Sequence, residues 1–218
     1  MILRFDEVAK LLKKYEIPMI ETRKIKKLEE VLNIGNKWGF PLVLKLDSKR
    51  ILHKTDIGGV ITNIQNKKEL EEAWQKIKKT AAKYTSDVLI QPYVKGVEII
   101  IGAKRDPVFG GVVMFGIGGI FVEVFKDVSF RIAPISKKEA KKMIKEIKGY
   151  PILKGYRGQN PVNIDKLTEI LVSVSKLIQK EKNIQEIDLN PVIVDQKRAL
   201  VVDAKILTNQ THYETRPR

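Results

Sequence analysis

The sequence predicts an α+β (α/β) protein with two lobes and mostly antiparallel sheets. Apolar residues recur at helical spacing in several segments, and short apolar runs typical of strands lie between them. Several of these runs are joined by short turns, which favours antiparallel pairing over a simple doubly wound parallel sheet. The phosphate-binding motifs G-x-x-x-x-G-K-[ST] and G-x-G-x-x-G are both missing.

Helical spacing of apolar residues predicts the helices. In the first, Pro18 follows the last apolar position and closes the segment. In the fourth, Ser136 and Glu139 form a capping box ahead of the apolar positions. The predicted helices cover residues 5–15, 25–38, 70–81 and 140–147, with a long one beginning near 165.

Short runs rich in apolar residues predict the strands. The last two runs, separated by the charged turn "DQKR", are typical of a hairpin. The predicted strands lie within residues 41–47, 60–64, 87–94, 97–105, 109–115, 121–125, 128–134, 184–194 and 199–207.

Composition limits the class of protein. The 218 residues are 43% hydrophobic and 31% charged, as expected of a globular protein with a real core. The absence of cysteine excludes disulfides, zinc fingers and thiol catalysis. No apolar run reaches the roughly 20 residues that a membrane span requires, and the mixed start of the chain is unlike a signal peptide. We therefore expect a cytoplasmic protein without a membrane partner.

The net charge of +15, from 41 Lys and Arg against 26 Asp and Glu, would attract anions of many kinds. The lysines occur mainly as pairs interleaved with glutamates, for example in "SKKEAKKMIKEIK", which is typical of solvated helical faces. No aromatic-plus-arginine stripe accompanies them, so nucleic acid is not the expected partner. A basic nucleic-acid binder stays an alternative.

Lys45 lies within the otherwise apolar run "LVLKLD". Burial of an ammonium group costs several kcal/mol unless an anion meets it, so either the strand is an edge strand and Lys45 faces solvent, or it meets a ligand. The nearby Gly58 and Gly59 would let backbone N–H groups approach phosphate oxygens. Together these residues suggest a polyphosphate clamp.

Polar residues also gather near the end of the chain. Asp188 and Asn190 are two residues apart in one predicted strand and so point to one face. The predicted hairpin would bring Asp203 close to both. An oxygen-only ligand set suits Mg²⁺ with phosphate, although "LNP" is also compatible with a plain turn.

Two further charged residues interrupt apolar runs. Glu98, in "VEIII", would meet a ribose hydroxyl or, equally well, a lysine. Arg131, in "VSFRIAP", would meet a phosphate.

Four segments taken together resemble a known family over nearly the whole chain. They are "GFPLVLKLDSKRILHKTDIGGV", "GIGGIFVEVFKDVSFRIAPI", "LKGYRG" and "EIDLNPVIV". In this order they resemble the ATP-grasp β subunit of ADP-forming acyl-CoA synthetases such as acetate–CoA ligase. The resemblance implies an ATP-grasp fold, with a nucleotide held between the sheets of an N-terminal lobe (residues 1–92, including the leading helix) and a C-terminal lobe (93–218).

The resemblance also implies roles for individual residues. Lys45 would hold the ATP phosphates, and the segment from His53 to Val60 would be the phosphate-proximal loop. His53 would take up the phosphoryl group, which a neutral imidazole can do near pH 7, and Asp188 would face a phosphohistidine; a plain surface turn is the alternative for His53. The remaining implied contacts are nucleotide contacts by Lys54, Gly58, Gly59 and Arg131, hinge contacts with adenine by Gln91, Tyr93 and Val94, a ribose contact by Glu98, and Mg²⁺ ligation by Asn190 and Asp203.

A CoA-binding domain with its own phosphorylated histidine is absent from the chain. The resemblance therefore implies an acid–thiol ligase subunit that needs a CoA-binding α partner, in an α2β2 heterotetramer. Its expected reaction is acyl-CoA + ADP + phosphate to acid + CoA + ATP, run reversibly, with Mg²⁺ as cofactor. The alternatives are a succinyl-CoA-synthetase-like β subunit with another acid and a regulatory nucleotide-binding module. We assign Arg157, in "LKGYRG", a possible contact with phosphate or partner and no other role.

Overall fold

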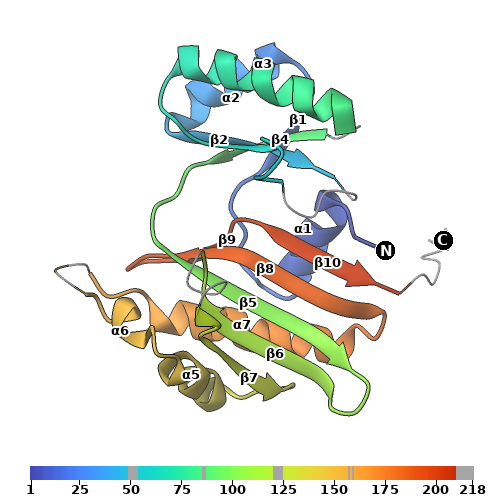
Figure 1. Cartoon of the computed structure of the whole chain (residues 1–218), viewed down its shortest axis with the longest axis vertical. Helices are drawn as coiled ribbons and strands as arrows, with labels where there is room; N and C mark the ends of the chain where they lie inside the picture. The colour runs from blue at the N-terminus through green and yellow to red at the C-terminus, as the bar shows by residue number, and fades with distance from the viewer. Residues whose placement is uncertain (49–53, 85–86, 120–124, 157, 159, 210–218) are drawn as a thin grey trace. The chain divides into compact units, whose positions relative to one another are not determined.

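The computed structural model describes residues 1–48, 54–84, 87–119, 125–156, 158 and 160–209 (Figure 1). These residues form two compact units, one of Ile20–Val94 and one of Met1–Met19 together with Lys95–Arg218. The second junction lies two residues from the predicted lobe boundary. The leading helix, which we expected in the N-terminal lobe, instead belongs to the larger unit.

The smaller unit is a four-stranded antiparallel sheet with two helices on one face (Figure 1). The strand order is β1-β4-β2-β3, so β2 is an interior strand. Leu42, Leu44 and Leu46 of β2 are fully buried against the helices. The elements are β1 (Arg23–Ile25), α2 (Leu28–Trp38), β2 (Leu42–Asp47), β3 (Val60–Ile64), α3 (Lys67–Tyr84) and β4 (Asp87–Pro92).

The larger unit is a six-stranded antiparallel sheet covered on one face by helices that share its core (Figure 1). The strand order is β10-β8-β5-β6-β7, with β9 also paired to β8. Its elements are α1 (Phe5–Lys14), β5 (Val97–Asp106), β6 (Gly110–Ile117), β7 (Val128–Ile132), α5 (Lys137–Glu146), α6 (Tyr150–Leu153), α7 (Ile164–Lys180), β8 (Ile184–Val194), β9 (Ala199–Val201) and β10 (Ala204–Thr208).

The leading helix joins the larger unit through its apolar stripe. Val8 and Leu12 of α1 are almost fully buried in the same core as α5 and α7. At its end, Lys14 and the Tyr15 hydroxyl both donate to the Glu181 carboxylate, at 2.6 and 2.7 Å. Position along the chain suggested the N-terminal lobe, but these contacts place α1 with the C-terminal elements.

Most predicted elements are confirmed, and the exceptions are short. Ile25, which we expected at the start of a helix, lies in the three-residue strand β1, and that helix begins at Leu28. The four-residue helix α6 was not predicted. The segments 87–94 and 97–105 are strands, but β4 and β5 belong to different sheets. The strand predicted at 121–125 lies almost wholly outside the described residues.

Candidate functional site

In the smaller unit, Lys45 is buried on an interior strand. Its side chain is 4% exposed, and β2 pairs with β3 on one side and β4 on the other. Because Leu44 and Leu46 face the helices, strand alternation directs Lys45 to the opposite face of the sheet. The alternative of a solvent-facing lysine on an edge strand is therefore wrong.

The Gly58–Gly59 turn lies next to Lys45. Val60, the first residue of β3, is aligned with Lys45, and the Leu46 amide donates to the Gly59 carbonyl at 2.9 Å. Gly58 has φ +69°, and a Cβ on Gly59 would lie 2.8 Å from the Lys54 carbonyl oxygen. The backbone angle favours glycine at position 58, and the lack of space requires it at position 59.

Lys54 is partly exposed at the start of this turn, and its carbonyl accepts the Gly59 amide at 2.7 Å. His53, the predicted phosphate acceptor, lies outside the described residues, as does Arg157.

The predicted hinge residues end β4 in the same unit. Gln91 is aligned with Val43, so it shares a sheet face with Lys45; its side-chain Nε2 donates to Thr22 Oγ1 at 2.8 Å. The Tyr93 amide donates to the Pro41 carbonyl at 2.9 Å. Tyr93 and Val94 are partly exposed, and any hinge contact from Tyr93 must use a group other than its amide.

In the larger unit, Asp188, Asn190 and Asp203 come together as predicted. Ile187 and Leu189 face the core, so Asp188 and Asn190 lie on the face away from α5 and α7. We call this the distal face; it also carries Gly102 and Lys205, both aligned with Asp188. The Asn190 amide donates to the Asp203 carbonyl at 3.1 Å, so the two predicted Mg²⁺ ligands are direct neighbours.

Regular strand pairing is interrupted both in β8 and between β9 and β10, and these two interruptions produce this arrangement. Leu189 and Val192 both face the core with two residues, Asn190 and Pro191, between them. On the returning strand, Val202 and Asp203 likewise separate β9 from β10, and the Val202 amide donates to the Pro191 carbonyl at 3.0 Å. Bulges of this kind re-aim side chains beside functional sites.

Burial and neighbouring charges both shift the pKa of Asp188. Burial, followed by the nearby Glu186 and Asp203 carboxylates, raises the pKa of Asp188, while Lys205 lowers it. The sequence analysis missed Lys205, although its spacing of two from Asp203 was a usable signal. Carboxylates with perturbed pKa in a cluster of this kind are typical of functional sites.

Glu98 lies on the distal face beside a glycine-rich segment. Its carbonyl accepts the Gly118 amide at 2.7 Å. A Cβ on Gly118 would lie 3.2 Å from the Glu98 carbonyl carbon, and one on Gly119 would lie 3.4 Å from Glu98 Oε2. The glycines thus leave space around an exposed carboxylate, a role that their sequence alone did not reveal.

Arg131 does not join these residues. It is aligned with the core residue Val113, so its side chain lies on the helix-covered face of the sheet. There its guanidinium binds the carboxylate of Glu146 on α5, which raises the pKa of Arg131 and lowers that of Glu146. A structural ion pair thus accounts for the cation that we expected to meet a phosphate.

In both units helices cover one face of the sheet, and Lys45, Gln91, Glu98, Asp188 and Asn190 lie on the other face. The model of the ATP-grasp domain matches residues 1–207. The chain belongs to the ATP-grasp family.

Among the described residues of this ATP-grasp chain, no group of three or more acidic or histidine side chains is arranged to hold a metal ion. No described helix has both the length and the apolar character needed to cross a bilayer.

The chain is similar to ADP-forming ligases that act on CoA. It is 48% identical to the β subunit of acetate–CoA ligase (ADP-forming) II from Pyrococcus furiosus, over 92% of this chain and 89% of the relative. It is 43% identical to 4-hydroxybutyrate–CoA ligase (ADP-forming) from Nitrosopumilus maritimus, over 88% of this chain and 28% of that longer protein.

A solved structure of an acetyl-coenzyme A synthetase from Ca. Korarchaeum cryptofilum matches with a TM-score of 0.81 and 42% identity. The match covers 95% of this chain and 92% of that one. That structure holds coenzyme A and Mg-AMPPCP, with a phosphohistidine segment pointing towards the nucleotide binding site.

Proposed function

We propose that this chain is the nucleotide-binding β subunit of an ADP-forming acyl-CoA synthetase and works with a separate CoA-binding α subunit. The observation that carries the proposal is the buried Lys45 beside the Gly58–Gly59 turn, on the sheet face opposite α2 and α3. A buried ammonium next to a glycine turn is suited to polyphosphate. Two relatives support the role of a separate subunit. One is a β subunit that this chain covers to 89% of its length, and the other is a longer ligase that it covers to only 28%.

The residues of the distal face fit the second half of a nucleotide site. The Asn190 amide oxygen and the Asp203 carboxylate form an oxygen-only set on adjacent strands, which fits Mg²⁺ completed by phosphate oxygens and water. When bound, Mg²⁺ would supply positive charge to the phosphates. Glu98 would accept ribose hydroxyls, and the carbonyls of the hinge residues Gln91, Tyr93 and Val94 would contact adenine.

The proposed reaction is the reversible conversion of acyl-CoA, ADP and phosphate to acid, CoA and ATP. In the direction of ATP cleavage, a histidine nitrogen attacks the terminal phosphorus, an N–P bond forms, and ADP leaves with the electron pair of the broken P–O bond. Lys45 and Lys54 would stabilise the transferring charge. Asp188 would orient the accepting imidazole by taking its N–H in a hydrogen bond, and His53 is our sequence-based candidate for a transient acceptor.

Mg-ATP titration of the isolated chain tests the nucleotide site. Lys45→Met keeps the volume of the side chain but removes its charge, so we expect affinity to fall by about tenfold or more. Lys76→Met on α3, at an exposed position, should leave affinity unchanged. Asp203→Ala should remove the Mg²⁺-dependent part of the binding. Unchanged affinity in Lys45→Met with preserved circular dichroism contradicts the proposal.

Reconstitution with the α subunit tests the reaction itself. The mixture should form ATP from ADP, phosphate and an acyl-CoA, and a panel of acyl-CoA thioesters identifies the acid. Acid-labile phosphate on this chain that is lost in His53→Ala supports the shuttle. Nucleotide binding without turnover in the mixture would instead indicate a regulatory module.

A further inference from the structure

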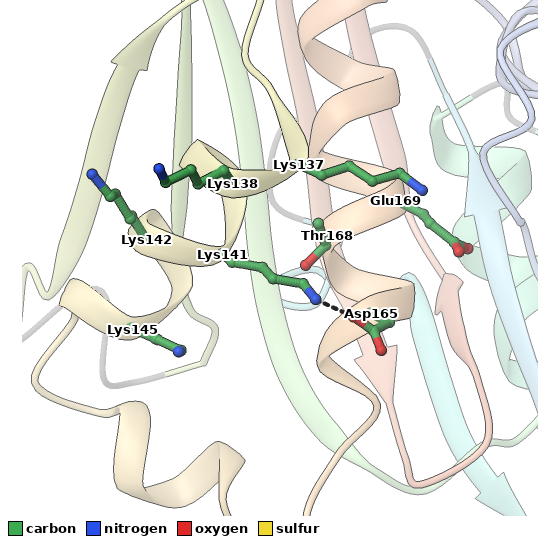
Figure 2. A pocket seen from close by; sticks show the side chains of 8 residues that line it. All are labelled: Lys137, Lys138, Lys141, Lys142, Lys145, Asp165, Thr168 and Glu169. Carbon is green, nitrogen blue, oxygen red and sulfur yellow. Dashed lines mark ion pairs between the residues drawn. The ribbon is translucent and has the colours of Figure 1, made fainter.

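A lysine-rich groove lies on the helix-covered side of the larger unit, between α5 and α7 (Figure 2). Its volume is about 650 Å³. Its lining consists of Lys137, Lys138, Lys141, Lys142, Lys145, Asp165, Thr168 and Glu169, which we call the α5 groove. The distal face with Asp188 and Asn190 is on the other side of the sheet, so the α5 groove is separate from the proposed nucleotide site.

The lysines of α5 form two stripes. Residues 137, 141 and 145 are spaced four apart, as are 138 and 142, so each stripe brings like charges side by side. Lys137 and Lys141 extend toward α7, whereas Lys138 and Lys142 extend away from it (Figure 2). Such spacing opposes helix formation unless anions lie nearby.

The protein neutralises little of this charge itself. Lys141 pairs with Asp165 at 2.7 Å, and Glu169 pairs with Lys166, which lies outside the lining, at 2.8 Å. The two glutamates of α5 are used elsewhere: Glu139 closes the capping box with Ser136, and Glu146 binds Arg131. The lining therefore has five ammonium groups against two carboxylates, an excess of three positive charges.

The chemistry of the lining favours a protein surface as the occupant. A second copy of this chain, also carrying +15, would be repelled. Nucleic acid is not favoured, because the lining contains neither arginine nor an aromatic ring. A protein can place carboxylates opposite the lysines.

We propose that the α5 groove docks an acidic surface of the CoA-binding α subunit. This inference rests on the proposed function, which requires such a partner. A subunit bound at the helix-covered side would leave the distal face available to nucleotide. The exposed charges would act mainly by steering association.

Association kinetics with the α subunit test the docking surface. The variant Lys137→Gln/Lys138→Gln/Lys142→Gln/Lys145→Gln removes four exposed charges but keeps the Lys141–Asp165 pair. We expect its association rate to fall about tenfold at about 0.05 M salt, and the difference to shrink at about 0.5 M. Its Mg-ATP affinity should equal that of the unmodified chain.

The matched control carries the same four changes on α3, at the exposed residues Lys67, Lys68, Lys76 and Lys79. Its association rate should stay close to that of the unmodified chain. Equal losses in both variants, or no loss in either, overturn the docking surface while the nucleotide proposal stands. DNA oligonucleotide binding that only the α5 variant loses would also overturn it. Failure of the unmodified chain to associate with α contradicts both this inference and the proposed function.

Discussion

At the scale of single residues, the candidate site depends on charged side chains in buried positions. Lys45 is an ammonium in an apolar strand, and Asp188 is a carboxylate whose pKa is raised by burial and by neighbouring carboxylates. Burial disfavours the ionised form of Asp188. Arg131, which looked equally unusual in the sequence, is satisfied by Glu146 and needs no ligand.

Gly58 and Gly110 allow a matched test of the glycine turn. Both have positive φ, +69° and +74°, and a Cβ at either would meet nothing within 4 Å. Gly58→Ala and Gly110→Ala should therefore each lower the free energy of unfolding by about 1 kcal/mol. Only Gly58→Ala should also weaken Mg-ATP binding, because only Gly58 lies beside Lys45. Chemical denaturation and calorimetric titration measure the two effects; equal nucleotide affinity in both variants would argue against a phosphate loop.

At the scale of elements, the end of α7 is held by long-range contacts. Arg105 of β5 donates from Nε to the Ile184 carbonyl at 3.1 Å, and from Nη2 to the carbonyls of Ile178 and Glu181. The last carbonyls of a helix lack partners within the helix, and a cation there also complements the helix dipole. Arg105 thus joins α7 to the sheet.

Arg105→Met should lower the free energy of unfolding by about 2–3 kcal/mol, since charged hydrogen bonds to buried acceptors are lost. Arg105→Lys should recover only part of this loss, because one ammonium cannot reproduce the forked contact. Thermal and chemical denaturation of the three proteins provide the comparison. A lysine variant as stable as the original chain would show that charge alone is sufficient.

Glu181 links α1 to the same helix end and predicts a pH dependence. Hydrogen bonds, first from Lys14 and also from Tyr15, lower the pKa of Glu181, against a raising effect of burial. A carboxyl with a lowered folded pKa stabilises above its unfolded pKa, and this contribution disappears as pH falls through the folded value. Glu181→Gln should cost about 1 kcal/mol at neutral pH and much less well below pH 4.

Unfolding at several pH values measures this difference, with Glu72→Gln, an exposed position of α3, as the control. The control should show no such pH-dependent loss. A constant penalty for Glu181→Gln from acid to neutral pH would mean that the interaction does not depend on ionisation.

The elements also show what the sequence could and could not predict. The capping box at Ser136 and the hairpin that joins Asp188 to Asp203 depend on local spacing, and both are confirmed. The placement of α1 and the contacts of Arg105 depend on residues more than 70 positions away, which local periodicity does not record. The face of Arg131 required the register of β7 on β6, which a single strand pattern leaves open.

At the scale of the whole molecule, each unit has a hydrophobic core of its own. The chain passes between them only near residues 19–20 and 94–95. Separate cores favour separate cooperative transitions unless a ligand couples them. A nucleotide held by residues of both units, as we propose, would provide such coupling.

We therefore expect two transitions in differential scanning calorimetry of the nucleotide-free chain. Leu42→Ala, at a fully buried position of β2, should cost about 2–5 kcal/mol and lower the transition of the smaller unit alone by about 10 °C or more. Leu171→Ala, equally buried in α7, should lower only the other transition. Saturating Mg-ATP should raise both transitions in the unmodified chain, since a ligand stabilises every unit that contributes to its site. If Mg-ATP raised one transition and left the other unchanged, the nucleotide would be bound by a single unit, and the roles assigned to the other unit's residues would have to be withdrawn.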